Sequence, residues 1–352
     1  MDKTLHHYSG IIHVHSTFSD GTLAVPEIAA IANELDINFV LITDHNTLQA
    51  KREGFEGWYN RILIGIGCEL NDEDDLNHYL AFNIEEEIPK NLDPYEYVHQ
   101  VSAKGGFGII AHPDESRDHI AKYRAFPWKI WDSELFNGIE IWNQMSEWME
   151  GLTHFNKYWR VLHPRRSIIT PKKETLEKWD KINLKRKVVG IGGVDAHGYV
   201  YKIFGIIPFT IFRYKISFKT IRTHLLLEEP LSQGTDARQD LQKIYAAILK
   251  ANCYVSHHYF GDASTFRFYA DDGQNQVMMG ESIAYSEQVK LKVINPQSAT
   301  TILVCNGQTI DKSEGQEVQF DVPQPGVFRI ESWVEQRPWI ISNHIRVNNP
   351  EG

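Results

Sequence analysis

The chain has 352 residues, which is long for one domain and favours two. Asp and Glu outnumber Lys and Arg by 46 to 36, and the net charge of −10 argues against general binding to nucleic acid or anionic membranes, although a local basic patch is compatible with it. The three cysteines are scattered and match neither a disulfide framework nor a CxxC zinc site, which is typical of a reducing compartment. The first ten residues lack the apolar core of a signal peptide, and no run is apolar enough to span a bilayer, so we expect a cytoplasmic protein.

The segment 8–46 predicts a strand, a helix and a second strand. In the first strand His13 and His15 stand two residues apart, so a regular strand would direct both to one face. The second strand is the apolar run 39–42, which is typical of a strand buried on both faces. Because the carboxyl ends of parallel strands meet on the ligand side of an α/β fold, the polar residues there should converge. These residues are His13, His15, Asp20, Asp44 and His45.

Later apolar runs repeat this arrangement as far as residue 197. Strands are predicted over 62–67, 78–82, 107–111, 138–142 and 188–193. The acidic and histidine residues at or near them are Glu69, His78, His112, Glu140, Asp195 and His197. A lone histidine is more often structural than functional, but the repetition over so many strands is a strong signal. Imidazoles and carboxylates are the ligands that zinc, manganese and iron favour, so the pattern predicts a metal site.

The last part of the chain has a different pattern. A helix is predicted over 236–251, and no helical period continues beyond residue 260. Short strands separated by Gly, Asn, Asp and Pro turns then predict an antiparallel β-sandwich. The six expected strands are 266–269, 289–294, 301–305, 318–322, 327–333 and 340–347. We therefore expect a first domain over 1–260 and an accessory domain over 261–352.

Five short blocks, HVHSTFSDG, ITDHN, GCEL, AHP and VDAH, occur in this order, and together they resemble the PHP (polymerase and histidinol phosphatase) superfamily over about residues 8–260. The resemblance implies an α/β fold, a distorted (β/α)7 barrel, with two or three divalent transition-metal ions (Zn, Mn or Fe) at the carboxyl ends of its strands. The implied ligands of the first ion are His13, His15, Glu69 and Asp195. The second ion would share Glu69 as a bridge and add His78 and His112. The third would take Asp20, His45 and His197.

Four further residues outside this ligand set are candidates for other roles. We expect Asp44 to orient a neighbouring ligand, so it joins Glu69 as a catalytic candidate. The role of Glu140 is open: it is an extra ligand, a partner of a ligand, or part of a structural ion pair. Arg117 and Lys202 each follow a ligand-bearing strand end, and both are candidates for binding substrate phosphate, with a solvent-facing charge as the alternative.

The leading hypothesis is a metal-dependent hydrolase, and within this class a two-domain PHP-type phosphoesterase. Two ions roughly 3.5–4 Å apart would lower the pKa of a bridging water and yield a hydroxide that attacks phosphorus. A carboxylic ester, amide or carbamate hydrolase is the alternative within the same chemistry, and a metal-stabilised binding module is the non-enzymatic one. We expect a small-molecule substrate as partner, neither nucleic acid nor membrane. The sequence leaves open the substrate, the physiological metal, the oligomeric state and the role of the sandwich.

Overall fold

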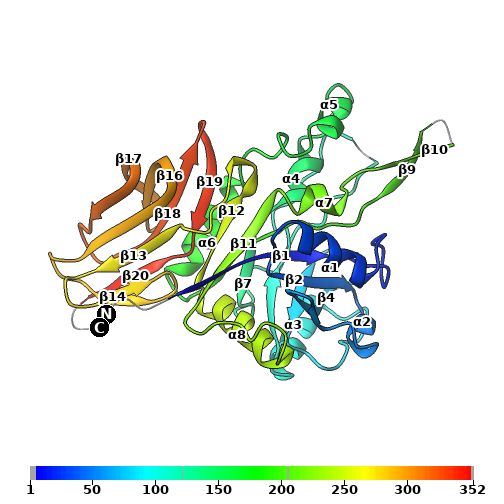
Figure 1. Cartoon of the computed structure of the whole chain (residues 1–352), viewed down its shortest axis with the longest axis horizontal. Helices are drawn as coiled ribbons and strands as arrows, with labels where there is room; N and C mark the ends of the chain where they lie inside the picture. The colour runs from blue at the N-terminus through cyan, green and yellow to red at the C-terminus, as the bar shows by residue number, and fades with distance from the viewer. Residues whose placement is uncertain (1–4, 121, 204–205, 350–352) are drawn as a thin grey trace.

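The computed structural model describes residues 5–120, 122–203 and 206–349. For residues 201–203 and 207–209 it describes the backbone alone. The chain forms a mixed α/β fold whose core is a largely parallel sheet, followed by a C-terminal region of antiparallel strands (Figure 1). In the described part of the chain, no helix is both long and apolar enough to cross a membrane.

Seven strands are hydrogen-bonded into a closed ring. In ring order they are β1 (His6–Val14), β2 (Phe39–His45), β4 (Ile62–Leu70), β5 (Tyr79–Phe82), β6 (Phe107–Ile110), β7 (Gly138–Asn143) and β8 (Val189–Gly193). Neighbours are parallel except at β5, which runs antiparallel to both β4 and β6. The ring closes beyond the end of β8, where the N–H of Val194 donates to Ile12 O at 3.1 Å and the N–H of His15 donates to Ala196 O at 3.0 Å.

Alternate residues of the ring strands belong to different apolar clusters. Phe39 and Leu41 of β2 pack with α8 (Ala237–Lys250), whereas Val40 and Ile42 pack in the cluster that contains α1 (Val25–Glu34). The side chains of one face therefore fill the ring and those of the other lie under the outer helices, as the period of a strand requires. Phe107, the first residue of β6, meets Tyr245 of α8 with ring centroids 5.4 Å apart. Helix α8 thus covers the amino ends of the parallel strands and leaves their carboxyl ends open.

The predicted helices are confirmed with small changes in their bounds. The helix predicted within 8–46 is α1, which begins at Val25, and the helix predicted over 236–251 is α8. Helix α3 begins at Pro94 and is capped by the Asp93 carboxylate. The polar segment 143–187 contains three helices: residues 151–156 separate α4 from α5, and residues 163–172, which include Pro164 and Pro171, separate α5 from α6. The remaining helices are α2 (Gln49–Arg52), α3 (Pro94–Ala103), α4 (Gln144–Glu150), α5 (Lys157–Leu162), α6 (Lys173–Asn183), α7 (Tyr214–Ser217) and the 3-10 helix η1 (His258–Phe260).

Two strands that the sequence did not predict connect the ring to the C-terminal region. Strand β11 (Ile221–Leu227) pairs with β1, and β12 (Cys253–His257) pairs with β11 and with β19 (Arg337–Ser342). The sheet is therefore continuous between the two parts of the chain, and the boundary near residue 260 stays a prediction. The other short strands of the first part are β3 (Gly57–Tyr59), β9 (Val200–Ile203) and β10 (Ile207–Thr210).

Eight strands follow residue 260, where the sequence predicted six. They are β13 (Arg267–Asp271), β14 (Gln276–Met278), β15 (Ser282–Ala284), β16 (Lys290–Cys305), β17 (Gln308–Asp321), β18 (Gly326–Val334), β19 and β20 (Ile345–Asn348). The predicted strands 289–294 and 301–305 are one strand, β16, whose register shifts between Ile294 and Ala299. The first half of β17 carries exposed side chains on both faces, so it lacks the alternation that would have predicted it. All pairs within this region are antiparallel except β15 with β20.

A buried ion pair joins the ring to the C-terminal strands. The guanidinium of Arg329 in β18 meets both carboxylate oxygens of Asp180 in α6, at 2.7 and 2.9 Å, and His344 Nε2 lies 2.8 Å from the same carboxylate. Asp180 and Arg329 are each 3 % exposed. Burial raises the pKa of the Asp180 carboxyl, but the hydrogen bonds from His344 and Arg329 outweigh it, and the net pKa lies below the ordinary 3.8.

Replacing Asp180 by Asn should lower the free energy of unfolding in urea by about 3–5 kcal/mol at pH 7, because it leaves the Arg329 charge buried without its partner. A depressed pKa in the folded state means that the contribution is present above pH 3.8 and is lost as the pH falls through the folded pKa. The difference between wild type and Asp180→Asn should therefore shrink in acid. The control is Glu177→Gln on the exposed side of α6, where the pair with Lys173 contributes only about 0.2–0.5 kcal/mol. Equal stabilities of Asp180→Asn and wild type at pH 7 would contradict this role.

Candidate metal centre

A β-bulge at the end of β1 orients the two histidines of the first strand. Ile12 pairs with Leu41 and Val14 pairs with the next residue of β2, so His13 is an extra residue in the ladder, with φ of +67°. Ile12 belongs to the inner cluster and Val14 to the outer one. In a regular strand His13 would therefore point away from the ring interior. Both His13 and His15 face Glu69, but the bulge at His13, rather than the simple alternation that the sequence predicted, brings them together.

The Glu69 carboxylate, at the end of β4, lies at the centre of the candidate site and is 1 % exposed. Its Oε2 is 3.2 Å from His13 Nε2 and 3.1 Å from His15 Nε2. Its Oε1 is 2.8 Å from His78 Nδ1 and 3.4 Å from His112 Nε2. Oε2 also lies 3.4 Å from His45 Nδ1. The two oxygens of one carboxylate thus face two different groups of imidazoles, which is the arrangement that a carboxylate bridging two cations requires.

Asp195, just beyond β8, completes the side of the site around His13 and His15. Its Oδ1 is 3.4 Å from Nε2 of both histidines and 3.4 Å from His197 Nδ1. Asp195 has φ of +53° and His112 has φ of +27°, so with His13 three of the predicted ligands adopt a left-handed backbone. Such conformations are uncommon for residues other than glycine, and they cluster at functional sites.

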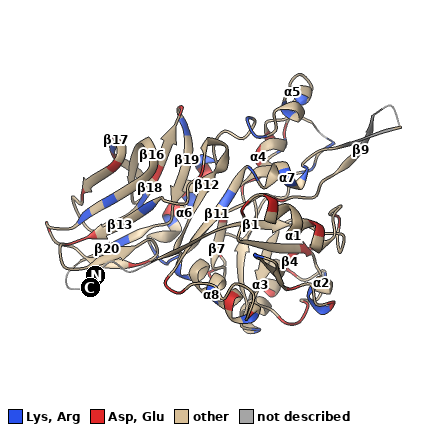
Figure 2. Ribbon diagram, viewed as in Figure 1, with Lys and Arg blue, Asp and Glu red and all other residues tan. Residues whose placement is uncertain are grey.

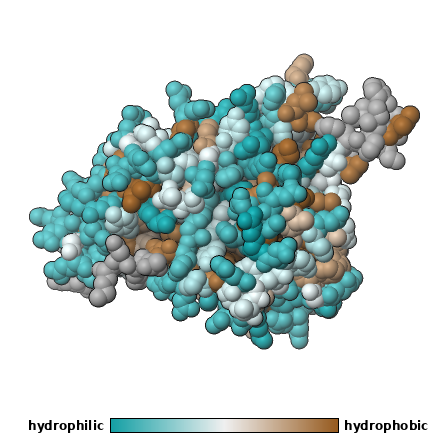
Figure 3. Space-filling view, viewed as in Figure 1, coloured by the Kyte–Doolittle hydropathy of each residue, from teal (hydrophilic) through white to brown (hydrophobic). Residues whose placement is uncertain are grey.

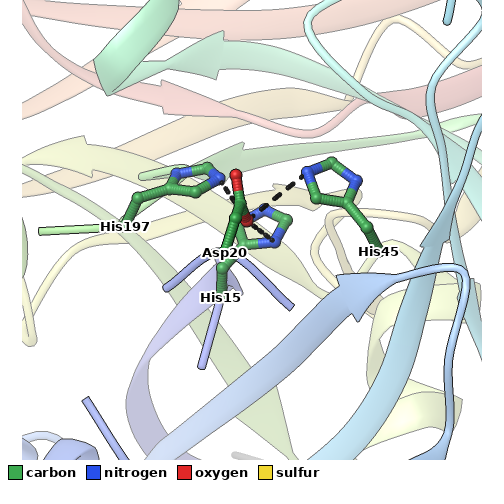
Figure 4. A group of neighbouring side chains, drawn as sticks. All are labelled: His15, Asp20, His45 and His197. Carbon is green, nitrogen blue, oxygen red and sulfur yellow. Dashed lines mark ion pairs between the residues drawn. The ribbon is translucent and has the colours of Figure 1, made fainter. Parts of the chain in front are cut away.

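A third group surrounds Asp20, which follows the turn after β1. Its Oδ1 is 3.2 Å from His197 Nε2 and 3.7 Å from a nitrogen of both His45 and His15, and Figure 4 shows the three imidazoles around this carboxylate. His45 and His197 were predicted in this group, whereas His15 was predicted only with the first ion. His15 is therefore shared, with one ring nitrogen toward each group.

Three sets of donor atoms lie close enough to hold an ion, each set within 4.8 Å: His15, Asp20, His45 and His197; His13, Glu69 and His112; and His13, His15 and Asp195. His78 is the one predicted ligand outside these sets, and it contacts Glu69 directly. The structure thus brings all nine predicted ligands into one site, and the division of the ligands among individual ions stays a prediction.

The chemistry of these donors fits cations. Nitrogen atoms of five of the imidazoles are buried without a hydrogen-bond partner, and they belong to His13, His15, His78, His112 and His197. A buried nitrogen without a partner is unfavourable, and a metal ion satisfies it. Burial disfavours the charged imidazole, yet the carboxylates raise the pKa of His15 to about 9 and of His78 to about 10. These carboxylates therefore require positive charge beside them, which protons or metal ions can supply.

Glu140, on β7, positions two of the predicted ligands. Its Oε1 lies 3.0 Å from His13 Nδ1, and its Oε2 accepts the backbone N–H of His112 at 2.8 Å and the side-chain amide of Asn143 at 2.9 Å. When His13 donates from Nδ1 to this carboxylate, its Nε2 is free to face Glu69. Of the three roles left open by the sequence, this geometry favours a partner of ligands.

Asp44 lies near the site but acts on the chain rather than on an imidazole. Its carboxylate accepts hydrogen bonds from the N–H and hydroxyl of Ser16, at 2.7 and 2.6 Å, and from the hydroxyl of Ser19 at 2.6 Å. Asp44 therefore fixes the segment between His15 and Asp20. It has no hydrogen bond to an imidazole in the described part of the chain, so its expected role of orienting a neighbouring ligand stays a prediction that would act through this segment.

A cavity of about 580 Å³ opens over these groups. Arg117 lines it, and the nearly buried Glu115 carboxylate holds its guanidinium, with Nε at 3.1 Å. Lys90 and Asp75 also line the cavity, with Phe18, Phe126, Met145 and Tyr199 forming its apolar and aromatic walls. The side chain of Lys202 lies outside the described residues, although its backbone pairs with Pro208 in the β9–β10 hairpin.

Sequence reasoning missed Lys90, Asp75 and the aromatic walls. Asp75 lies in the acidic turn after β4, with its Oδ1 3.5 Å from His78 Nε2. Lys90 lies shortly after three consecutive glutamates, and such a charged stretch is typical of a solvated segment. The only available signal for Asp75 was its position three residues before a predicted ligand.

Comparisons with known proteins give distant similarities. No family model matches the chain. The uncharacterized protein MJ1587 of Methanocaldococcus jannaschii is 26 % identical over 145 residues, which cover 38 % of this chain and 80 % of that protein. The crystal structure of a two-domain protein from Bacteroides vulgatus, containing a predicted PHP-like metal-dependent phosphoesterase, matches 97 % of this chain and 95 % of its own, with a TM-score of 0.46 and 14 % identity. An amidohydrolase from Chromobacterium violaceum, with bound sulfate and no metal, matches 53 % of this chain and 87 % of its own, with a TM-score of 0.30 and 14 % identity. Similarity at this level does not assign an activity, so the functional argument rests on the site.

Replacing Glu140 by Gln should weaken metal binding about 10–100-fold, because the amide cannot accept all three hydrogen bonds that orient His13 and His112. The measurement is competition with a chromophoric chelator. The control is Glu314→Gln, an exposed position of β17. The thermal stability of the metal-free variant should be close to that of the metal-free wild type, although its metal affinity is lower. Unchanged affinity with a large loss of stability would assign Glu140 a purely structural role.

Proposed function

We propose that this protein is a metal-dependent hydrolase and that its substrates are phosphate esters. The observation that carries the proposal is the Glu69 carboxylate, whose two oxygens face separate groups of imidazoles at the floor of a cavity. The closed ring of seven strands is compatible with the distorted (β/α)7 barrel that the PHP resemblance implies. A binding module with a structural metal needs only one closed site, so the several linked groups favour catalysis.

The nine predicted ligands would hold two or three divalent ions, with Zn, Mn and Fe as the candidates. Bound ions would act as Lewis acids and lower the pKa of a water molecule toward neutrality. The protein supplies the orientation: Glu140 fixes His13, and Asp44 fixes the segment that carries Asp20. The aromatic side chains of Phe126 and Tyr199 form part of the cavity wall.

The charge of the cavity wall supports a phosphate substrate. The guanidinium of Arg117 is held by Glu115 and stacks at 5.3 Å from the Phe126 ring, so it is ordered before a substrate arrives. Lys90 adds a second cation on the wall. A phosphoryl group spreads its charge over several oxygens, and cations on several sides suit it better than they suit one neutral carbonyl.

A carboxylic ester, amide or carbamate is the second candidate substrate class. The observation that favours it is the apolar part of the wall, where Phe18, Phe126 and Met145 would accept an uncharged substrate. The effect of Arg117 on turnover distinguishes the two substrate classes, because only a charged substrate is stabilised by the guanidinium.

Replacing Glu69 by Gln should lower both the metal content and the turnover. The change removes the negative charge that faces both groups of imidazoles, and we expect turnover to fall by about 10²-fold or more, the scale of losing one group that stabilises the transition state. Metal content is measured by elemental analysis of the purified protein, and turnover on a panel of phosphomonoesters, phosphodiesters and carboxyl esters. Glu314→Gln serves again as the control. Full metal content and full activity in Glu69→Gln would refute the proposed centre.

Replacing Arg117 by Ala should reduce turnover of phosphate esters by about 10²-fold while changing turnover of a neutral ester far less. The control is Lys122→Ala, an exposed cation of the same loop that does not line the cavity. Equal small effects on both substrate classes would leave Arg117 without a role in binding. Activity on carboxyl esters alone would select the second candidate.

A further inference from the structure

Helix α5 exposes its apolar side chains and buries a charged one, the reverse of the usual arrangement of a surface helix. Phe155, just before the helix, is 100 % exposed, Tyr158 and Leu162 are 73 % exposed and Trp159 is 50 % exposed. We call these four side chains the α5 patch. Their spacing of three to four residues places them along one side of the segment. Arg160, on the other side, is 6 % exposed.

The inward side of α5 is firmly attached to α4. Arg160 donates to the backbone carbonyls of Glu147 and Ser167, at 3.1 and 3.3 Å, and its guanidinium lies 5.6 Å from the Trp148 ring. The indole of Trp148 donates to the Arg160 carbonyl at 3.1 Å. These bonds fix the orientation of α5. The four apolar side chains therefore face outward because the helix is anchored that way, not because α5 is loosely packed against the rest of the protein. Figure 1 shows α5 standing away from the body of the molecule, and Figure 3 shows hydrophobic surface at the same place.

The surroundings of the patch are basic in an acidic protein. Residues 151–173 contain six Lys or Arg and no Asp or Glu, whereas the whole chain has a net charge of −10. In the described part of the chain Lys157, Arg165 and Arg166 form no ion pair, and Figure 2 shows basic positions on α5. Aromatic side chains flanked by unpaired cations are suited to an interface between water and an anionic lipid surface.

The size of the patch also favours a membrane over a folded protein. A helix of six residues is about 9 Å long, too small to provide alone the roughly 800 Å² per partner that a stable protein complex buries. Insertion into a bilayer interface needs no complementary surface, only a few apolar side chains that reach about 5–10 Å into the boundary region.

We propose that α5 docks this protein on the surface of a membrane containing anionic phospholipids, which replaces the expectation from the net charge that the protein has no membrane partner. The four side chains of the α5 patch enter the interface, and Lys157 and Arg166 contact the headgroups. Helix α4, which carries α5, also supplies Met145 to the wall of the active-site cavity, so docking brings the cavity close to the lipid surface. The proposal does not depend on the chemistry of the metal centre.

The test is co-sedimentation of the full chain with vesicles of phosphatidylcholine, with and without phosphatidylglycerol. We expect binding only to the anionic vesicles, and the double variant Phe155→Ser, Trp159→Ser should bind at least about 10-fold more weakly, the effect of no longer burying one or two large apolar side chains. Lys157→Gln and Arg166→Gln should each weaken binding about 5-fold, and added salt should act in the same direction. The control is the double variant Leu249→Ser, Ile310→Ser, which removes exposed apolar side chains from α8 and β17 and should bind like wild type.

A second measurement does not depend on the serine variant. Quenching of tryptophan fluorescence by brominated lipids should occur in the wild type and should be largely removed in Trp159→Phe, because the other eight tryptophans are not in the patch. No binding to either vesicle, or binding unaffected by Phe155→Ser, Trp159→Ser, would overturn the proposal. Sedimentation velocity that finds a dimer dispersed by the same variant would assign the patch to a second copy of the chain and would also overturn it.

Discussion

The negative charge of Glu69 is held at a position with 1 % exposure, and the rest of the candidate site is arranged around it. An isolated carboxylate at such a position is strongly unfavourable unless it is paired. Burial raises its pKa, but the neighbouring imidazoles, those of His13 and His78 first, hold the pKa well below the usual range. Carboxylate and imidazoles are therefore mutually dependent, and cations between them would satisfy both.

The ring of strands makes this concentration of polar groups possible. Each ligand lies at or beyond a strand end, where the backbone leaves the ladder and can take unusual conformations such as those of His13, His112 and Asp195. Helix α8 covers the opposite end with apolar side chains, so polar and apolar groups are separated along the ring axis. This separation is the usual arrangement when a closed sheet carries a site at the carboxyl ends of its strands.

The region after residue 220 supports the site without contributing a predicted ligand. Gly192, on the edge of β8, exchanges hydrogen bonds with the Thr223 hydroxyl at 2.9 and 2.8 Å, and Gly190 exchanges bonds of 2.8 Å with the side-chain amide of Asn343. Along β8 itself no ladder joins this strand to β1, because the hydrogen bonds that close the ring lie beyond the end of β8. Side chains from β11 and from the C-terminal region thus take the place of a neighbouring strand, and β8 leads directly to Asp195 and His197. The C-terminal strands are a physical support of the ligand-bearing strand.

The amino-acid sequence by itself determined all seven strands of the ring and located polar residues at their ends. It could do so because a buried strand is a short apolar run, and a polar residue at the end of such a run stands out. The choice of nine of these residues as metal ligands is what the PHP resemblance implied. The order of the ligand blocks carried the PHP resemblance. The sequence also located the change to short strands after residue 260, although β14, β15 and the exposed half of β17 lack the period that marks a strand.

Only the tertiary structure decided how these residues act, because the deciding contacts join positions far apart in the chain. The bulge that turns His13 inward depends on the register with β2. Glu140 positions a histidine 127 residues away, and Asp44 was found to hold a loop rather than an imidazole. Whether a side chain is buried is equally non-local: Arg160 is hidden and Phe155 is fully exposed, opposite to what their chemistry alone would predict, because α4 offers carbonyl groups to the first and nothing covers the second in the described part of the chain.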